Sequence, residues 1–403
     1  MQKLKNYWAQ YISSYQGLSQ ATWLLAAVMF INQSGSMVLP FLGVYMTTVL
    51  DFSIKNAGIV LSTFGVGSIL GSFLGGWLTD KFGAFKIQVF SLFISIPFYL
   101  ILPYFKTFET LCVAIFCLSL MKELFRPANS ASVSYYAKPE NLIRAFSLNR
   151  MALNLGYSIG PAIGGFLAAV SYDFLFYTNA IMSFCAGVIF FIYFRNRKGY
   201  GTEKNLKSEK ITDKPTKSAY TDVKFILFSI CVALYATSFF QILNTLPIFY
   251  KDVAGLTEKN VGVLMGFNGI VVFLLEMALV HYAEKKFTLK LNLIIGTLLC
   301  GLAFLVLIPS YALWVLYLSI FVISISEILV MPFASTVAVN RSSTNNRGSY
   351  MGLNGMSFSV AFITSPLLGT LIAENYGFTN LWIFNCLMIV IASLGFYLVM
   401  KKL

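Results

Sequence analysis

Five ionisable residues lie inside long apolar segments of this 403-residue chain, and their side chains are the ones best suited to chemistry. They are Lys122, Glu123, Arg126, Glu276 and Glu327. A charged side chain at the centre of a lipid bilayer costs about 2.5–3.5 kcal/mol on insertion scales, so such residues usually face a cavity or one another. We therefore expect them to take up and release protons or to bind a charged solute.

The spacing of three of these residues places them on adjoining faces of one helix. Lys122 and Arg126 are four residues apart and share a face, whereas Glu123 and Arg126 are three apart and can form an ion pair. Burial disfavours the charged form of a carboxyl group, and a nearby cation favours it. A cation that moves between two conformations would therefore make Glu123 or Glu327 take up and release a proton.

Structural interpretations of the same acids stay open. Glu123 and Arg126 can form a static buried pair that holds their helix in place. Glu327 can have a structural function, although no basic residue is close to it in sequence. Glu276 lies about two turns inside Glu284 and can extend to the cytoplasmic surface or to the gate.

Uncharged amides form the second set of candidates for contact with a solute. They lie within apolar segments, and they are Asn32, Gln33, Asn129, Gln241, Asn244 and Asn354. Each amide can donate and accept hydrogen bonds in a cavity. For each residue taken alone, a hydrogen bond between two helices is the favoured interpretation.

The elements that carry these residues are apolar segments of about twenty residues, the length of a helix that crosses a bilayer core about 30 Å thick. The chain is 58% hydrophobic and 11% charged, with a mean hydropathy of +0.75. Soluble domains are about 45–50% apolar and about 25% charged, so a soluble enzyme is excluded. The pattern predicts an all-α membrane protein. Twelve spans are predicted, at 22–49, 56–78, 85–104, 109–132, 150–170, 174–194, 221–249, 261–281, 287–309, 311–337, 350–372 and 379–400.

The basic residues predict the orientation of these spans. Of the 29 Lys and Arg residues, fourteen in the termini and short loops and nine in the central loop lie on one side, which makes 23. Four lie on the opposite side, and Lys122 and Arg126 lie within the fourth span. Because Lys and Arg concentrate in cytoplasmic loops, we expect both termini and the central loop in the cytoplasm. The net charge of +13 then reflects topology, and no nucleic-acid partner is expected.

The sequence offers no basis for a metal site, a cofactor or an enzyme active site. His281 is the only histidine, and the six cysteines lie inside apolar segments without a C-x-x-C pair. No triad-like constellation lies at either surface, and no phosphate-binding G-x-x-x-x-G-K-[ST] loop occurs. We expect no enzymatic activity, no cofactor and no metal.

A polar stretch and an internal repeat divide the chain into two halves. Residues 195–220 are rich in Lys, Ser, Thr and Gly and are predicted to form a cytoplasmic linker between six-helix bundles at 1–194 and 221–403. A shift of 205 residues aligns the halves, and the pairs are Pro127 with Pro332, Pro161 with Pro366, Leu148–Asn149 with Leu353–Asn354, and Gly164 with Gly369. The same shift places Glu327 opposite Lys122. We therefore expect two pseudo-symmetric bundles, the parallel-repeat arrangement of secondary transporters.

The loop after the second span carries a motif that resembles the signature of the major facilitator superfamily. The sequence GWLTDKFGAFK resembles G-x-x-x-D-[RK]-x-G-x-[RK]-[RK], with Gly76, Asp80, Lys81, Gly83 and Lys86 at motif positions. The resemblance implies a twelve-helix major facilitator fold in which these residues form a cytoplasmic gate. An acid at a helix end can meet the positive N-terminus of another helix, and breaking that contact would favour the other access state.

The fifth span resembles the G-x-x-x-G-P-x-x-G-G motif of the superfamily's drug:proton antiporters. The matching residues are Gly156, Gly160, Pro161, Gly164 and Gly165. Their predicted function is close packing of helices and a bend at the proline, without contact to substrate.

The chain departs from the family pattern at three places. Two positions that are usually basic in the signature are Ala84 and Phe85, and the second-half copy has degenerated to the sequence HYAEKK. The usual arginine early in the fourth span would fall near Phe116 and is absent, so relay schemes that use it do not transfer.

The resemblance implies a proton-coupled exporter of amphipathic compounds that works as a monomer in the cytoplasmic (inner) membrane of a bacterium. Its expected partners are a small-molecule substrate, protons and the lipid bilayer. An importer or exchanger of an anionic metabolite is the alternative, because one glutamate does not neutralise both Lys122 and Arg126.

Overall fold

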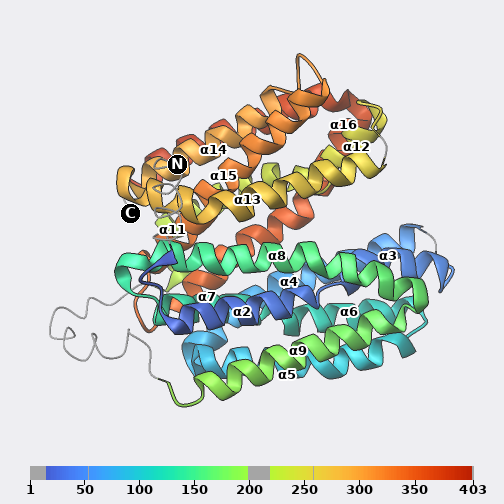
Figure 1. Cartoon of the computed structure of the whole chain (residues 1–403), viewed down its shortest axis with the longest axis vertical. Coiled ribbons are helices and arrows are strands. Elements are labelled where there is room, and N and C mark those ends of the chain that lie inside the picture. The colour runs from blue at the N-terminus through green and yellow to red at the C-terminus, as the bar shows by residue number, and fades with distance from the viewer. Residues whose placement is uncertain (1–14, 53, 198–217, 257, 402–403) are drawn as a thin grey trace, which may run out of the picture. The chain divides into compact units, whose positions relative to one another are not determined.

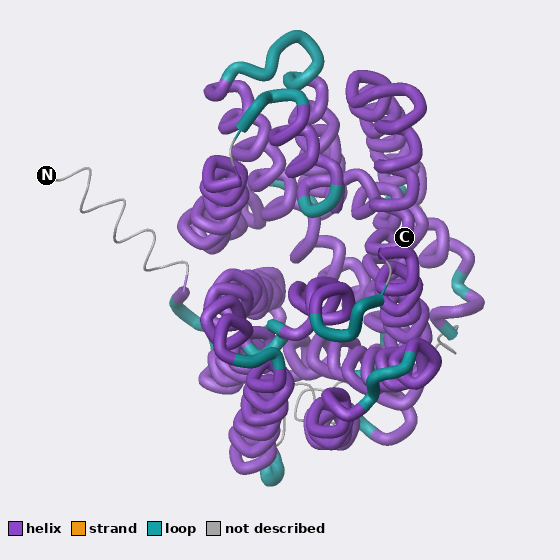
Figure 2. The backbone as a smooth tube through the Cα atoms, turned by 90° about the vertical axis from the view of Figure 1, so that its right-hand side faces the viewer, coloured by secondary structure: helices purple, strands orange, loops and turns teal. Residues whose placement is uncertain are grey.

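The computed structural model describes residues 15–52, 54–197, 218–256 and 258–401. Every regular element in these ranges is a helix, and Figure 2 accordingly shows purple helices joined by teal loops and no orange strand. The prediction of an all-helical chain is confirmed for this part of the protein. The chain forms two compact units, which we call the N-terminal unit (Leu18–Ala219 with Ser342–Met356) and the C-terminal unit (Tyr220–Arg341 with Met1–Gly17 and Ser357–Leu403).

The N-terminal unit contains the helices labelled α2 to α9 in Figure 1. They are α2 (Gln20–Ser34), α3 (Val38–Thr48), α4 (Ile54–Phe82), α5 (Ala84–Ile101), α6 (Phe108–Glu123), α7 (Phe125–Tyr136), α8 (Leu142–Val170) and α9 (Asp173–Phe194), with short 3-10 turns η1 (Leu102–Tyr104) and η2 (Pro139–Asn141).

The C-terminal unit is built from a second series of helices. They are α11 (Val223–Phe239), η4 (Phe240–Ile242), α12 (Thr245–Asp252), α13 (Glu258–Lys286), α14 (Leu289–Leu305), α15 (Leu313–Arg341) and most of α16 (Arg347–Val399), preceded by the short turn η3 (Ala219–Thr221). The first residues of α16 belong to the N-terminal unit. Gly377, at φ 82° and ψ 166°, interrupts α16, so two helices are joined there.

The helix boundaries reproduce the 205-residue repeat seen in the sequence. α6 starts at 108 and α15 at 313, while α8 starts at 142 and α16 at 347. The interruptions recur as well, because the non-helical turn at 35–37 after α2 is matched by η4 at 240–242. The 205-residue repeat therefore holds for helix boundaries as well as for the five matched positions in the sequence.

Seven stretches of the described chain are long and apolar enough to cross a membrane. They are Ile59–Phe82, Ala84–Tyr104, Asp173–Phe194, Val223–Asp252, Asn260–Lys286, Leu313–Arg341 and Arg347–Val399. The first predicted span is divided into α2 and α3, of 15 and 11 residues, and the fourth into α6 and α7, of 16 and 12. Because such pieces are short, the total of twelve spans stays a prediction.

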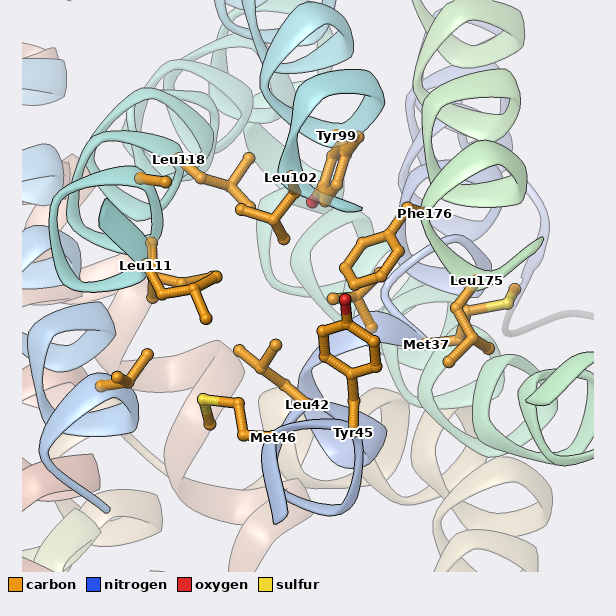
Figure 3. Packing of buried hydrophobic residues seen from close by; sticks show 14 of the residues in the cluster. Met37, Leu42, Tyr45, Met46, Tyr99, Leu102, Leu111, Leu118, Leu175 and Phe176 are labelled. Carbon is orange, nitrogen blue, oxygen red and sulfur yellow. The ribbon is translucent and has the colours of Figure 1, made fainter. Parts of the chain in front are cut away.

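A buried apolar cluster holds one end of the N-terminal unit's helices against one another. Figure 3 shows Leu42 and Tyr45 of α3 facing Leu102, Leu118 and Phe176. The rings of Tyr45 and Phe176 meet edge to face, with centroids 5.5 Å apart. Since lipid is as apolar as these side chains, close packing rather than the hydrophobic effect stabilises such contacts.

Candidate functional site

A small polar pocket in the N-terminal unit brings together five of the predicted site residues. Its lining comes from α2, α6, α7 and α8 and consists of Met29, Asn32, Gln33, Lys122, Glu123, Phe125, Arg126, Leu153 and Tyr157. Its volume of about 20 Å³ is room for about one water molecule. All of the lining residues belong to the N-terminal unit. A pocket of this size can hold a water, a proton or one polar group of a larger solute.

Glu123 and Arg126 form the ion pair that their spacing predicts. Glu123 Oε2 lies 3.4 Å from Arg126 Nε, across the point where α6 ends and α7 begins. The glutamate side chain is 9% exposed, whereas the arginine side chain is 36% exposed. The arginine is therefore the more exposed partner of the pair, and the carboxylate is enclosed.

Lys122 contacts the interruption between α2 and α3. Its Nζ donates a hydrogen bond to Ser36 Oγ at 2.7 Å, and Ser36 lies in the non-helical turn at 35–37. The lysine side chain thus links α6 to the break in the first predicted span. Sequence reasoning missed Ser36, because nothing local to a serine indicates which distant cation it will contact.

Tyr157 is a second pocket residue that sequence reasoning missed. Its side chain lines the pocket together with Arg126. The sequence feature that could have indicated Tyr157 is the preceding motif glycine, Gly156. Gly156 packs so tightly against α2 that a Cβ there would lie 2.8 Å from Gln33 Cβ. The residue that follows such a glycine lies beside the same interface.

Asn129 lies away from this pocket. It is fully buried on α7, and its Nδ2 donates to Asn149 Oδ1 on α8 at 3.2 Å. The structure therefore shows the helix-to-helix hydrogen bond that was the favoured interpretation for this residue.

The two amides of the seventh predicted span join the break at η4 to α16. Gln241 Nε2 donates to the Ser365 carbonyl at 3.0 Å, and its Oε1 accepts from Thr245 Oγ1 at 2.7 Å. Asn244 Nδ2 donates to Ser365 Oγ at 3.1 Å. Both amides thus stabilise an irregular segment next to Pro366.

The remaining polar candidates are buried on long helices. Glu327 on α15 is 5% exposed, and the neighbouring Ser326 hydroxyl lies 3.1 Å from that of Tyr235. Glu276 on α13 has no exposed surface, so its side chain is enclosed and does not reach the surface of the described structure. Asn354 is 5% exposed, and its Oδ1 has no hydrogen bond to any described residue.

Asp80, the acid of the loop motif, caps the N-terminus of α16. Its carboxylate accepts the backbone N–H groups of Gly348 at 2.5 Å and Ser349 at 2.8 Å, and it also accepts the Ser349 hydroxyl. A negative charge at this helix end interacts favourably with the helix dipole. Gly76 makes the approach possible, because a Cβ there would lie 2.6 Å from the Gly348 carbonyl oxygen.

The other residues of the loop motif have simpler surroundings. Gly83, at φ 89°, precedes α5 in a backbone conformation that a side chain would strain. Lys81 Nζ lies 5.0 Å from the Trp77 ring centroid, and Lys86 is exposed.

Three of the four glycines in the fifth-span motif pack α8 against the first predicted span. A Cβ on Gly160 would lie 2.7 Å from the Ser34 carbonyl oxygen, and one on Gly164 would lie 2.9 Å from Met37 Cβ. Gly165 differs, since its nearest neighbour would be 3.8 Å away on Phe41. The side chain of Pro161 lies outside the described ones.

Comparison with known proteins identifies the family of this chain. The family model of the Major Facilitator Superfamily matches residues 22–349 and 282–402. The uncharacterized MFS-type transporter YttB of Bacillus subtilis (strain 168) is 25% identical over 389 residues, covering 96% of both chains.

Two further relatives have names that state a function. The Na(+), Li(+), K(+)/H(+) antiporter of Planococcus maritimus is 24% identical over 85% of this chain and 87% of its own. The multidrug resistance protein MdtH of Blochmanniella pennsylvanica (strain BPEN) is 25% identical over 92% of this chain and 90% of its own.

A solved structure shows the same fold. The crystal structure of a bacterial homologue of the iron transporter ferroportin, in an outward-facing state, superimposes with a TM-score of 0.76 over 95% of this chain and 100% of its own, at 14% identity. At that identity the likeness concerns the fold alone. The chain belongs to the major facilitator superfamily, and it is a multi-pass membrane transporter of a small-molecule substrate rather than an enzyme.

Proposed function

We propose that this protein is a secondary active transporter that exports amphipathic organic compounds by alternating access, driven by proton entry. The fifth-span motif supports this proposal, and so do relatives named as a multidrug resistance protein and as a cation/proton antiporter. At identities of 24% and 25%, these names support proton-coupled antiport as the class of reaction. The substrate has to be identified by experiment.

The observation that carries the proposal is the unequal enclosure of Glu123 and Arg126. The carboxylate is enclosed in a pocket with room for about one water, and its cationic partner is partly exposed. When Arg126 lies against Glu123, the charged carboxylate is favoured and the proton leaves. When Arg126 turns away, the enclosed carboxylate binds a proton, so the pair can convert a proton gradient into a conformational bias.

Glu327 is the second proposed proton carrier. It is 5% exposed, and it lies 205 residues after Lys122, at the matching position of the repeat. Glu276 is kept as a third candidate because it is an acid without exposed surface in a membrane protein. Lys122 is proposed to couple this chemistry to the α2–α3 break through Ser36.

Asp80 is proposed to stabilise one access state. Its carboxylate accepts hydrogen bonds from the first turn of α16, and α16 then continues into the C-terminal unit. Loss of these hydrogen bonds would favour the other access state. Gly76, Gly83, Lys81 and Lys86 support this gate through close approach, backbone conformation and charge.

Import or exchange of an anionic metabolite is the second candidate function. Lys122 and Arg126 line one pocket with a single glutamate between them in sequence, so the three side chains carry one net positive charge when all are ionised. A carboxylate or phosphate group would be bound there by charge-assisted hydrogen bonds. The pocket volume of about 20 Å³ admits such a group only if the pocket widens.

The organisation proposed for this activity is a monomer in a bacterial inner membrane with both termini in the cytoplasm. Residues 1–194 and 221–403 would form the two moving bundles, and residues 195–220 would link them. The excess of Lys and Arg on one side of the predicted spans supports this orientation. Labelling of single cysteines introduced at Lys106 and Lys138, from outside intact cells, tests it.

Flux into proteoliposomes with an imposed pH gradient tests the function. Cationic dyes are screened first and labelled organic anions second, with protein-free vesicles and a gradient-free arm as controls. Dye accumulation that requires the gradient supports the exporter. Anion uptake that disappears in Arg126→Ala, with dye transport unchanged, supports the second candidate instead.

A further inference from the structure

Two lysines from helices far apart in the chain converge on one tyrosine ring of the C-terminal unit. Lys290 Nζ lies 3.9 Å from the centroid of the Tyr397 ring, and Lys401 Nζ lies 4.5 Å from it. Lys290 is in the first turn of α14, Tyr397 is in the last turn of α16, and Lys401 follows that helix. The fold therefore holds two ammonium groups beside one ring at the ends of two apolar helices.

The part of the chain that the structure describes places no counter-anion beside these ammonium groups. Among the described residues, neither Lys290 nor Lys401 has a carboxylate within ion-pair distance. The nearest acid in sequence to Lys290 is Glu284, which pairs with His281 at 3.2 Å. The ring attracts each cation but carries no net charge, so it does not neutralise the two ammonium groups. A negatively charged group beside the ring would neutralise them.

The surroundings indicate which anion would have access. Leu394 and Leu398, on the same stretch of α16 as Tyr397, are 57% and 61% exposed, and Leu291, next to Lys290, is 41% exposed. In a membrane transporter, exposed leucines of this kind face acyl chains. Lysine ammonium groups and tyrosine rings at helix ends lie at the level of the headgroups.

We propose that Lys290, Tyr397 and Lys401 form a binding site for the headgroup of an anionic phospholipid. The ammonium groups bind the phosphodiester beside the ring, and the acyl chains extend along Leu394 and Leu398. Basic pockets between membrane helices bind anionic headgroups in this manner. The site is separate from the polar pocket of the N-terminal unit, and it depends on the membrane location of the chain rather than on the substrate.

Lipid titration of the purified protein tests the site. Phosphatidylglycerol and phosphatidylcholine are added separately to protein in the same detergent, and bound lipid is counted by native mass spectrometry. The variant Lys290→Gln/Lys401→Gln is compared with Lys106→Gln/Lys251→Gln, which removes the same charge from two exposed lysines elsewhere. We expect affinity for phosphatidylglycerol to fall about tenfold or more in the first variant only. Affinity for phosphatidylcholine should not change.

Two further arms test the ring and distinguish a lipid headgroup from free phosphate. Tyr397→Leu keeps both lysines and should weaken phosphatidylglycerol binding about threefold through loss of the ring. Monodispersity on size exclusion confirms that each variant is folded. An affinity within about twofold of wild type in Lys290→Gln/Lys401→Gln overturns the proposal, since two lysines should contribute far more. Displacement of the lipid by millimolar inorganic phosphate also overturns it, because the site would then bind free phosphate.

Discussion

The ammonium group of Lys122 donates a hydrogen bond to the Ser36 hydroxyl, 2.7 Å away, at the turn that separates α2 from α3. Lys122 is adjacent to Glu123, whose ion pair with Arg126 spans the junction of α6 and α7. The charged residues of this pocket therefore contact the turn between α2 and α3 and lie at the junction of α6 and α7. Helices broken near a binding site are a recurrent feature of secondary transporters.

A double-mutant cycle measures the strength of the contact between Lys122 and Ser36. Ser36→Ala removes the acceptor of the partly buried ammonium group, so it should destabilise the protein by about 1.5–3 kcal/mol, the range for hydrogen bonds to charged groups. Lys122→Met/Ser36→Ala should be no less stable than Lys122→Met alone. Thermal unfolding in detergent gives the four values, and additive effects of the two substitutions would show that the contact contributes nothing.

Asp80→Asn tests the proposed gate. The substitution keeps an oxygen near Gly348 and Ser349 but removes the negative charge at the N-terminus of α16. Such a charge stabilises a helix end by about 0.3–1 kcal/mol, and by up to about 2 kcal/mol when partly buried. We expect the access equilibrium to shift by about twofold to thirtyfold toward the other state. The readout is the labelling rate of a cysteine introduced at Asn354, with Glu140→Gln as the charge control. Equal labelling rates in Asp80→Asn and wild type would contradict the proposed gate.

Two glycines of the same helix provide a matched test of packing. Gly160→Ala places a Cβ 2.7 Å from the Ser34 carbonyl oxygen, whereas Gly165→Ala places it 3.8 Å from Phe41. The first should cost about 1–3 kcal/mol through overpacking, and the second should be within about 0.5 kcal/mol of wild type. Thermal unfolding of both variants in one detergent decides the matter. Equal stability of the two variants would refute the close packing at Gly160.

Local features of the site could be predicted from sequence, and long-range ones could not. The pairing of Glu123 with Arg126 follows from helical spacing alone. The acid Asp80 could be expected at a helix N-terminus, but the sequence did not identify that helix as α16, because Gly348 lies 268 residues away. Ser36 and Tyr157 were missed for the same reason.

The motif glycines show the same division. The pattern predicted close packing for all four glycines, yet Gly165 has only ordinary contacts, because it occupies a different face of α8 from Gly160 and Gly164. The 205-residue repeat predicted where helices correspond, and their ends agree with it. The interruptions at 35–37 and 240–242 were not predicted, since no proline lies in either turn.

Proton-driven flux through Glu123→Gln and Glu327→Gln tests the central proposal most directly. In proteoliposomes, one pH unit can drive about tenfold accumulation per coupled proton. We expect at least one of the two variants to lose this accumulation while it retains downhill exchange, because an amide cannot carry the proton. Glu140→Gln, at an exposed acid in η2, should behave as wild type. Undiminished dependence on the pH gradient in both variants would contradict proton coupling through these acids.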